Sequence, residues 1–160
     1  GFNVSGARSR HEGVEAALDW QASDTVGFSL AGSWTRHTYD FSFDGRGQAI
    51  VDGNDIDTAP RWLAAGEVRW QPAPGWRWDT VLRYVGQYYL DPGNRFEYPG
   101  HVLLDLRAFF EPAPGWRVAA RLDNALDARY ADRADYAMGD YRYLPGRGRA
   151  LFVELRRGEL

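Results

Sequence analysis

Apolar and polar residues alternate with a period of two over most of this 160-residue chain. Between residues 13 and 20, Val14, Leu18 and Trp20 fall on one face, and acidic side chains fall on the other. Side chains of a β-strand point alternately to its two faces, so this period predicts strands that are apolar on one face. The same pattern predicts further strands over residues 26–35, 61–70, 76–89, 102–110, 116–123 and 151–156, about seven in all. Residues 1–11 are small and polar and are expected to form a loop.

Short and long connections alternate between these expected strands. The sequence Pro72-Ala73-Pro74-Gly75 recurs as Pro112-Ala113-Pro114-Gly115, and residues 20–24 form a weaker copy of the same unit. Prolines fix φ and a glycine permits positive φ, so each copy predicts a tight reversal. The long connections, residues 38–59, 90–100 and 125–146, lack periodicity and are expected to be irregular. We therefore predict an antiparallel up-and-down meander, with Ala22, Pro72 and Pro112 at one end and Gly45, Gly93 and Gly139 at the other.

Large aromatic residues gather on the apolar face beside the short turns: Trp20, Trp70, Trp76, Phe110 and Trp116. In membrane β-barrels, the apolar face contacts lipid, and aromatic residues mark the membrane interfaces. A soluble antiparallel sheet alternates in the same way, but it has no reason to gather tryptophans at one height. The pattern therefore favours a membrane barrel, with a soluble sheet as the alternative.

The alternation also assigns side chains to the two faces of the expected barrel wall. We expect the convex, lipid-facing side to carry Trp62, Val68, Trp78, Leu82, Leu104, Val118 and Val153. We expect the concave side to carry Glu67, Asp79, Arg83, Asp105, Arg107, Arg121 and Glu154, mostly as cross-strand charge pairs. Replacing Leu104 by Arg should then cost about 2–4 kcal/mol near the bilayer midplane, whereas Asp105→Asn should cost little.

Composition narrows the class of partner. The balance of 19 basic and 22 acidic residues gives a net charge of −3, which argues against a nucleic-acid partner. All the basic residues are arginine, and the absence of cysteine rules out disulfides and thiolate metal sites. No signal peptide opens the sequence, and no apolar run approaches the roughly 18 residues that a spanning helix requires.

Three segments resemble one family. Residues 121–130, with Leu122-Asp123-Asn124-Ala125-Leu126-Asp127 and Tyr130, are similar to the N-L-F/L-D-x-x-Y segment of TonB-dependent outer-membrane receptors. Residues 144–153 resemble the Pro-Gly-Arg sequence that precedes their final strand, and residues 13–20 resemble their G-x-E-x-x-L strand. The resemblance implies an all-β fold, an antiparallel meander of about seven strands that forms a segment of a large transmembrane β-barrel. Alone, such a segment would be an open sheet, without a ladder between residues 13–20 and 148–156.

The family also implies a function. Its members form a barrel of about 22 strands around an N-terminal plug, and they import scarce nutrients such as ferric siderophores or cobalamin with energy relayed by TonB. Residues 1–160 would then be the C-terminal segment of the barrel domain, without the plug, in the outer membrane. The implied partners are outer-membrane lipid, the rest of the barrel, the plug, TonB and a small-molecule ligand. The sequence departs from the family at its end, where residues 156–160 follow the last strand in place of a terminal aromatic.

Two other functions remain open at this stage. One is a small self-contained outer-membrane barrel that serves as an anchor or adhesin, although such barrels have an even number of strands, eight or more. The other is a soluble β-sandwich module that binds carbohydrate through exposed Trp and Tyr side chains. Extraction of the native product without detergent would support the soluble module.

The long-loop end carries the candidate binding residues. Aromatic side chains there can stack on a bulky ligand while cationic side chains meet its charge, and the candidates are Tyr89, Arg95, Tyr98, His101, Tyr141 and Arg142. The three histidines are scattered singly, without the ligand spacing of a metal site. Residues 52–57 are rich in oxygen ligands, but Ile56 and Asp57 depart from the calcium-loop motif. We therefore expect no cofactor, no metal and no catalytic residues, and hence no enzyme.

Overall fold

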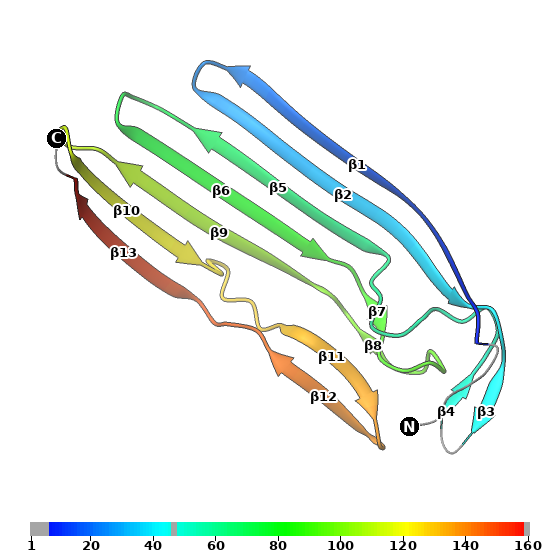
Figure 1. The fold of residues 1–160 in the computed structure, drawn as a ribbon. Coiled ribbons are helices and arrows are strands. Elements are labelled where there is room, and N and C mark those ends of the chain that lie inside the picture. The colour runs from blue at the N-terminus through cyan, green and yellow to red at the C-terminus, as the bar shows by residue number, and fades with distance from the viewer. Residues whose placement is uncertain (1–6, 46–47, 159–160) are drawn as a thin grey trace.

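The computed structural model describes residues 7–45 and 48–158. It is built from strands, and none of the described residues forms a helix long and apolar enough to cross a membrane. Seven strands form the main sheet (Figure 1): β1 (Ser9–Ser23), β2 (Val26–Tyr39), β5 (Trp62–Trp70), β6 (Trp76–Val85), β9 (His101–Phe110), β10 (Trp116–Asp123) and β13 (Ala150–Arg157).

The order of strands in the main sheet follows the chain, and every neighbouring pair is antiparallel. The predicted meander is therefore confirmed. The connections between β1 and β2, β5 and β6, and β9 and β10 all lie at one end of the sheet, while the long connections lie at the other (Figure 1). The predicted separation of short and long connections is also confirmed.

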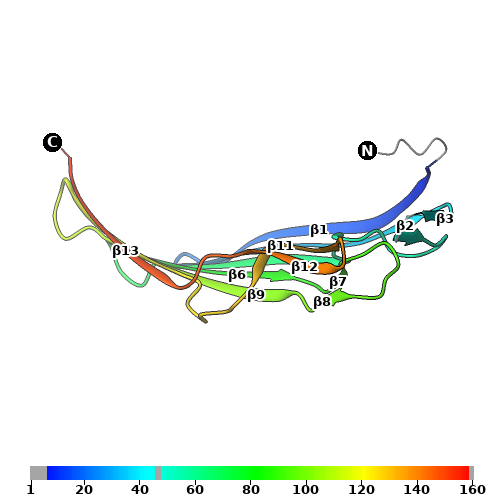
Figure 2. The same ribbon diagram turned by 90° about the horizontal axis from the view of Figure 1, so that it is seen from below.

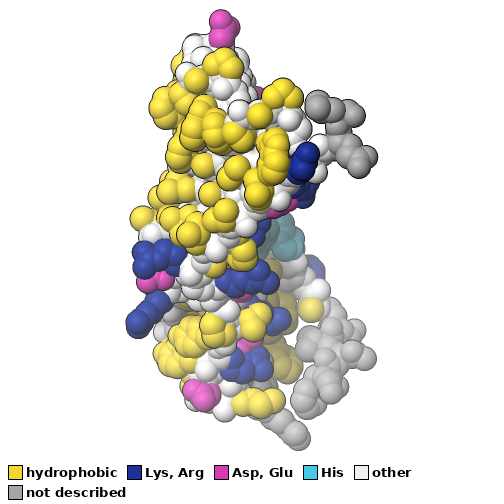
Figure 3. All heavy atoms as spheres, turned by 90° about the vertical axis from the view of Figure 1, so that its left-hand side faces the viewer, with side chains coloured by type: hydrophobic (Ala, Val, Ile, Leu, Met, Phe, Trp, Pro, Cys, Tyr) yellow, Lys and Arg dark blue, Asp and Glu magenta, His cyan; other side chains and the backbone are white. Residues whose placement is uncertain are grey.

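The register places the predicted apolar and charged sets on opposite faces. Leu82 lies opposite Leu104, and Val118 lies opposite Phe110, so the apolar residues of neighbouring strands share a face. Asp79 lies opposite Arg107, and because both residues are an odd number of positions from the apolar residues of their strands, this pair lies on the other face. Apolar residues remain exposed across the first face, which in this chain alone has no covering layer. Figure 2 shows a single curved layer of strands, and Figure 3 shows a broad hydrophobic area in the upper part of the view, with arginine, acidic and further hydrophobic side chains below it.

The two Pro-Ala-Pro-Gly turns have the same conformation. Gly75 has a φ of 78° and Gly115 a φ of 77°, and in each turn the tryptophan amide that follows donates to the alanine carbonyl at 3.0 Å. The carbonyl of Gly75 also accepts a hydrogen bond from the amide of Glu111, and that of Gly115 accepts one from Gly158. Each turn is thus joined to the next segment along the same rim of the sheet, beyond the ends of the strands.

The aromatic residues beside the short turns pack against one another. Trp76 stacks on Phe110 at 4.1 Å between ring centroids, and Trp20 stacks on Phe28 at 5.6 Å. Their register places these rings on the apolar face, where Trp20 and Trp70 remain about half exposed. Exposed aromatic rings at one height of an apolar face are typical of a membrane interface.

The two edges of the main sheet are β1 and β13, which stand at opposite ends of the strand order. Within the described residues, no ladder joins residues 13–20 to 148–156, as the sequence predicted. The sheet is therefore open and not a closed seven-stranded barrel, which counts against the small self-contained barrel.

The long connections contain strands that the sequence pattern missed. The connection over residues 125–146 was predicted to be irregular, but it forms a hairpin of β11 (Ala131–Ala137) and β12 (Asp140–Pro145). Two further small sheets pair β3 (Phe43–Gly45) with β4 (Gln48–Ile50) and β7 (Tyr88–Tyr89) with β8 (Glu97–Tyr98). These strands are short or rich in alternating charge and tyrosine, so they lack an apolar face of period two.

Strand ends also differ from the prediction. Strand β1 begins at Ser9 because its polar residues pair with β2 as far as Tyr39, so the predicted loop over residues 1–11 is too long; residues 1–6 lie outside the described residues. The predicted strand over residues 76–89 is interrupted after Val85, because β6 ends there and Tyr88–Tyr89 form β7, which pairs with β8 in a separate small sheet. The predicted tail is described as far as Gly158, and residues 159–160 lie outside.

Charges on the polar face pair mainly along strands. Arg77 and Asp79 lie two residues apart on β6 and form two hydrogen bonds of 2.7 and 2.8 Å. Arg83 and Asp105 form a cross-strand pair at 2.6 Å. The prediction of cross-strand pairs was therefore wrong for most of these residues, because residues i and i+2 of one strand share a face and long arginine side chains reach along it.

Asn124 lies in the segment that resembles the family, and its contacts show what this residue does in the fold. It is buried, has a φ of 50°, and follows the last residue of β10. Its amide nitrogen Nδ2 donates to the carbonyls of Ala128 and Arg147 at 3.0 and 3.2 Å, and its Oδ1 accepts from the Ala128 amide at 2.9 Å. Its backbone amide donates to Asp105 Oδ1 at 2.9 Å. One side chain thus fixes the turn after β10 and the segment that leads into β13.

Candidate ligand-binding site at the long-loop end

Within residues 7–45 and 48–158, the buried apolar cluster lies in the long connections and not in the main sheet. It consists of Leu90, Tyr98, Ala131 and Ala134, with Tyr88, Phe96 and Tyr136 packed against it. Leu90 and Ala134 are completely buried. The amide of Tyr136 donates to the Leu90 carbonyl at 2.8 Å, which joins β11 to the connection between β7 and β8. Two of the long connections therefore form one packed unit above the sheet end.

Tyr98 is the centre of this unit. Its hydroxyl accepts a hydrogen bond from the Ala131 amide at 3.0 Å and lies 3.0 Å from His101 Nδ1. The His101 ring packs on Tyr130, with 4.7 Å between their centroids. Because Tyr98 is only 6% exposed, it positions the β11–β12 hairpin and is not free to contact a ligand directly. His101, which contacts both Tyr98 and Tyr130, belongs to the same packed unit.

Asp91 organises the turn between β7 and β8. Its carboxylate accepts hydrogen bonds from the amides of Arg95 and Phe96 at 2.8 and 3.1 Å and from Arg95 Nε at 2.9 Å. Burial opposes ionisation of Asp91, but these hydrogen bonds and the arginine charge outweigh it and hold the pKa of Asp91 below its ordinary value. The turn is therefore built around an ionised carboxylate.

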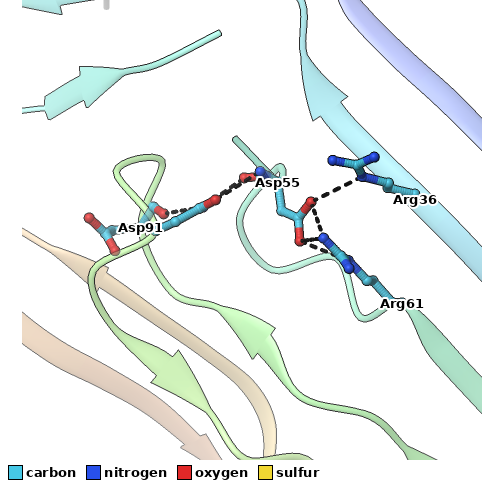
Figure 4. A network of polar contacts seen from close by, with 5 residues as sticks. Arg36, Asp55, Arg61 and Asp91 are labelled. Carbon is cyan, nitrogen blue, oxygen red and sulfur yellow. Dashed lines mark hydrogen bonds and ion pairs between the residues drawn. The ribbon is translucent and has the colours of Figure 1, made fainter. Parts of the chain in front are cut away.

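A second polar contact joins this turn to the connection between β2 and β5 (Figure 4). Asn94 and Asp55 exchange two hydrogen bonds: the Asp55 amide donates to Asn94 Oδ1 at 2.8 Å, and Asn94 Nδ2 donates to the Asp55 carbonyl at 2.9 Å. The Asp55 carboxylate receives Arg61 through two hydrogen bonds and lies 3.9 Å from Arg36. Asp55 is thus held by arginines within a segment whose composition resembles a calcium loop.

Two of the candidate residues, Arg95 and Tyr141, belong to an accessible aromatic surface. Phe96 packs on Tyr136 at 4.1 Å between centroids, Tyr141 meets Phe96 edge-on at 5.4 Å, and the Arg95 guanidinium lies 5.5 Å from the Phe96 centroid. Arg95 and Tyr141 both remain about half exposed. We call Arg95, Phe96, Tyr136 and Tyr141 the aromatic surface. It presents ring edges and faces beside a cation.

Arg142 lies on the same hairpin strand as Tyr141. Its Nε is 2.5 Å from Asp135 Oδ1, and its side chain is 56% exposed. Arg133 also approaches the Asp135 carboxylate, at 3.5 Å. A guanidinium has five N–H donors in a planar fork, so an arginine held at Nε can offer its outer edge to a carboxylate or phenolate of a ligand.

The six predicted residues therefore divide into two groups. Tyr98 and His101 contact each other inside the packed unit, where they support the loops. Arg95 and Tyr141 meet at Phe96, whereas Arg142, next to Tyr141 along β12, pairs with Asp135 on the other face of the β11–β12 hairpin. Tyr89 lies apart from them in β7, where burial and the Glu97 carboxylate raise its pKa. Whether these side chains bind a ligand stays a prediction.

The sequence reasoning missed the polar residues that shape the site. Asp55, Asp91 and Asn94 fix the two connections, and Asn94 adopts a φ of 54°. The Asp91-Pro92-Gly93-Asn94 sequence indicated a turn, but a turn signal does not say which distant segment the turn contacts. In residues 7–45 and 48–158, no group of three or more His, Asp or Glu side chains is arranged to hold a metal ion.

Comparison with solved structures identifies the same fold in larger proteins. The ferric yersiniabactin uptake receptor FyuA from Yersinia pestis is 17% identical, with a TM-score of 0.78 over 94% of this chain and 24% of its own. The siderophore receptor PiuA from Acinetobacter baumannii is 18% identical, with a TM-score of 0.80 over 94% of this chain and 22% of its own. The ferric citrate transporter FecA is 16% identical, with a TM-score of 0.78 over 94% and 24%.

This chain spans about a quarter of the length of those structures. A comparison with curated proteins found no match. The family described as TonB dependent receptor-like, beta-barrel matches residues 1–125, more than three quarters of the chain. The strand order of the main sheet, the aromatic residues beside its short turns and its exposed apolar face agree with that family. The chain belongs to the TonB-dependent receptor-like β-barrel family, whose members lie in the outer membrane.

Proposed function

We propose that residues 1–160 are the C-terminal segment of the barrel of an outer-membrane receptor that imports a scarce nutrient as a small complex, such as a ferric siderophore or cobalamin. The receptor acts in transport and not as an enzyme. The rest of the barrel and a plug domain complete it, and TonB supplies the energy. The family match and the open edges at β1 and β13, which require further strands in a membrane, support this proposal.

The aromatic surface carries the ligand proposal. Its rings offer stacking partners, and Arg95 and Arg142 offer half-exposed cations within the same loop unit. This combination suits a bulky, anionic ligand with aromatic or carboxylate groups, which includes ferric complexes of chelating acids and phenols. The proteins FyuA, PiuA and FecA, described as uptake or transport proteins for iron complexes, favour iron among the possible nutrients.

The loop packing supports a preformed site. The turn at Asp91, the Asp55–Asn94 contact and the Tyr98 cluster link all three long connections of the described chain. Loops that are held in place lose less entropy when a ligand binds. We therefore expect the aromatic surface to keep its shape without ligand.

The test uses the full-length protein that contains this chain. Purified protein is titrated with a set of ferric chelates, and a strain that lacks its gene is grown with each chelate as the sole iron source. Arg95→Gln is the informative variant because Arg95 belongs to the aromatic surface, and the amides of residues 95 and 96 still donate to Asp91 in the variant. We expect it to weaken binding about tenfold or more, which is 1.4 kcal/mol or more.

Arg156→Gln is the matched control, since Arg156 is an exposed, paired arginine at the short-turn end of the sheet. It should bind the chelate as the wild type does. Equal binding by Arg95→Gln and wild type would refute the assignment of the ligand surface. Unchanged growth of the deletion strain on every iron, cobalamin or other nutrient complex would refute the transport function itself.

A further inference from the structure

Two of the three histidines, which the sequence places far apart, meet across the first hairpin of the sheet. His11 on β1 lies directly opposite His37 on β2. Their Nδ1 atoms are 2.6 Å apart, and their ring centroids are 4.8 Å apart with 58° between the ring planes. The interpretation of these histidines as isolated residues was therefore wrong, because strand pairing joins positions 26 residues apart.

The contact requires one of the two facing nitrogens to be unprotonated, with its lone pair directed at the other ring. An N–H on one ring must donate to an unprotonated nitrogen on the other, since two N–H groups cannot face each other at this distance. Ser9 Oγ lies 2.8 Å from His11 Nε2. When Nε2 of His11 carries the hydrogen and donates it to Ser9, Nδ1 of His11 is unprotonated and directs its lone pair at His37. A second partner that fixes the tautomer in this way is typical of metal-ligating histidines.

The pair is accessible and lies away from the aromatic surface. It projects from the polar face of the sheet, in register with the neighbouring pairs Ser9–Tyr39 and Gly13–Thr35 and near the long-loop end. His11 is exposed and His37 half-buried. The charged residues Glu12 and Arg36, next to them along the strands, point to the opposite face because successive side chains alternate.

We propose that His11 and His37 bind a late first-row divalent cation, with Cu²⁺ the most tightly held and Ni²⁺ and Zn²⁺ weaker. Imidazole nitrogens suit these ions, and affinity for a given nitrogen site peaks at Cu²⁺. With each Nδ1 about 2.1 Å from the ion, the two nitrogens stand roughly 3.0–3.4 Å apart. Small rotations of the two side chains open the present contact to that distance, and water fills the remaining positions.

Binding exchanges the shared hydrogen for the cation. The hydrogen on the donating Nδ1 moves through solvent to Nε2 of the same ring, so the ring stays neutral and both Nδ1 lone pairs then face the ion. The ion links β1 to β2 near their long-loop ends, and because the unfolded chain does not preform the pair, it stabilises the folded hairpin by mass action. This site is independent of the proposed nutrient ligand, since it shares no residue with the aromatic surface.

The test titrates the detergent-solubilised full-length protein with CuCl₂ and follows the Cu²⁺ electron paramagnetic resonance spectrum. We expect a signal whose superhyperfine splitting reports two equivalent nitrogens. His11→Gln and His37→Gln should each lose that splitting and weaken Cu²⁺ binding about tenfold or more, and Ser9→Ala should weaken it about tenfold. His101→Gln, the third histidine of the chain, is the matched control and should leave the signal unchanged.

Each variant is first checked for its folded electrophoretic mobility without heating, so that loss of the signal is read only from folded protein. A second readout is the midpoint of thermal unfolding, which CuCl₂ should raise in the wild type and in His101→Gln but not in His37→Gln. Retention of the two-nitrogen signal at unchanged affinity in folded His11→Gln or His37→Gln would overturn the proposal. So would its loss in His101→Gln alone.

Discussion

Replacing Asn124 by aspartate tests the residue that holds the end of β10. The two side chains have the same shape, and both tolerate the left-handed backbone that Asn124 adopts, so the fold imposes no new steric demand. Aspartate keeps the oxygen that accepts from the Ala128 amide. It loses the two donations from Nδ2 to the carbonyls of Ala128 and Arg147.

The size of the effect follows from these contacts. Each lost hydrogen bond is worth about 1 kcal/mol, and a buried acceptor left without a donor costs about 1–3 kcal/mol. Asn124 is only 4% exposed, so the carboxylate would also face two carbonyl oxygens with little water. We expect Asn124→Asp to lower the free energy of unfolding by about 2–4 kcal/mol at neutral pH. The loss should shrink on acidification, since a protonated aspartate regains one donor.

The measurement is the urea dependence of folding of the full-length protein into lipid vesicles, followed by tryptophan fluorescence. Asn54→Asp is the matched control: Asn54 Nδ2 makes one donation to the Pro92 carbonyl, at 3.1 Å. It should cost about 1 kcal/mol or less. Equal losses for the two variants, or an Asn124→Asp loss that does not change with pH, would refute the reasoning.

Three further outcomes follow from the structure. Leu104→Arg, on the apolar face, should destabilise the barrel in lipid by about 2–4 kcal/mol; Asp105→Asn, expected from the pattern to be nearly neutral, should cost about 1–2 kcal/mol because the carboxylate is buried against a charged donor. Because the pKa of Asp91 is lowered by folding, its ionised form stabilises the β7–β8 turn above about pH 4 and loses that effect as pH falls further. Asp91→Asn should therefore increase proteolysis of the turn at pH 7, and the difference from the wild type should shrink as the pH falls below about 4; equal cleavage of both proteins at pH 7 would contradict this. Gly100→Ala should cost about 2 kcal/mol or more in urea titrations, since φ is 80° and a Cβ would lie 2.2 Å from the Val85 carbonyl oxygen.

The main sheet could be predicted from the sequence because its information is local. Period-two alternation assigns Leu104 and Asp105 to opposite faces without knowledge of any neighbour, and the two Pro-Ala-Pro-Gly turns fix where the chain reverses. Direction and strand order then follow, since short reversals require adjacent antiparallel strands. The same local signals also located the aromatic rim.

The long-loop end could not be predicted because its structure depends on distant contacts. Strand β11 mixes alanine with charged residues, and charge alternates with tyrosine only over residues 140–143, so the hairpin shows no clear apolar period; it is held by Tyr98 from another connection. The exchange of hydrogen bonds between Asp55 and Asn94 likewise joins segments 39 residues apart. The candidate residues at this end were chosen by side-chain chemistry, which does not separate the buried Tyr98 from the accessible Tyr141.

The short turns are joined to one another by hydrogen bonds along the end of the sheet, so the hairpin is a structural unit that can be repeated. The carbonyls of Gly75 and Gly115 are placed to receive the next segment, so the acceptor that docks one hairpin is built into the turn of the hairpin before it. A whole hairpin could then be duplicated or removed between two such glycines while the rim remains continuous, because every remaining turn still offers the same acceptor. A wall assembled in this way changes in steps of two strands, and its width is set by how many turns follow one another.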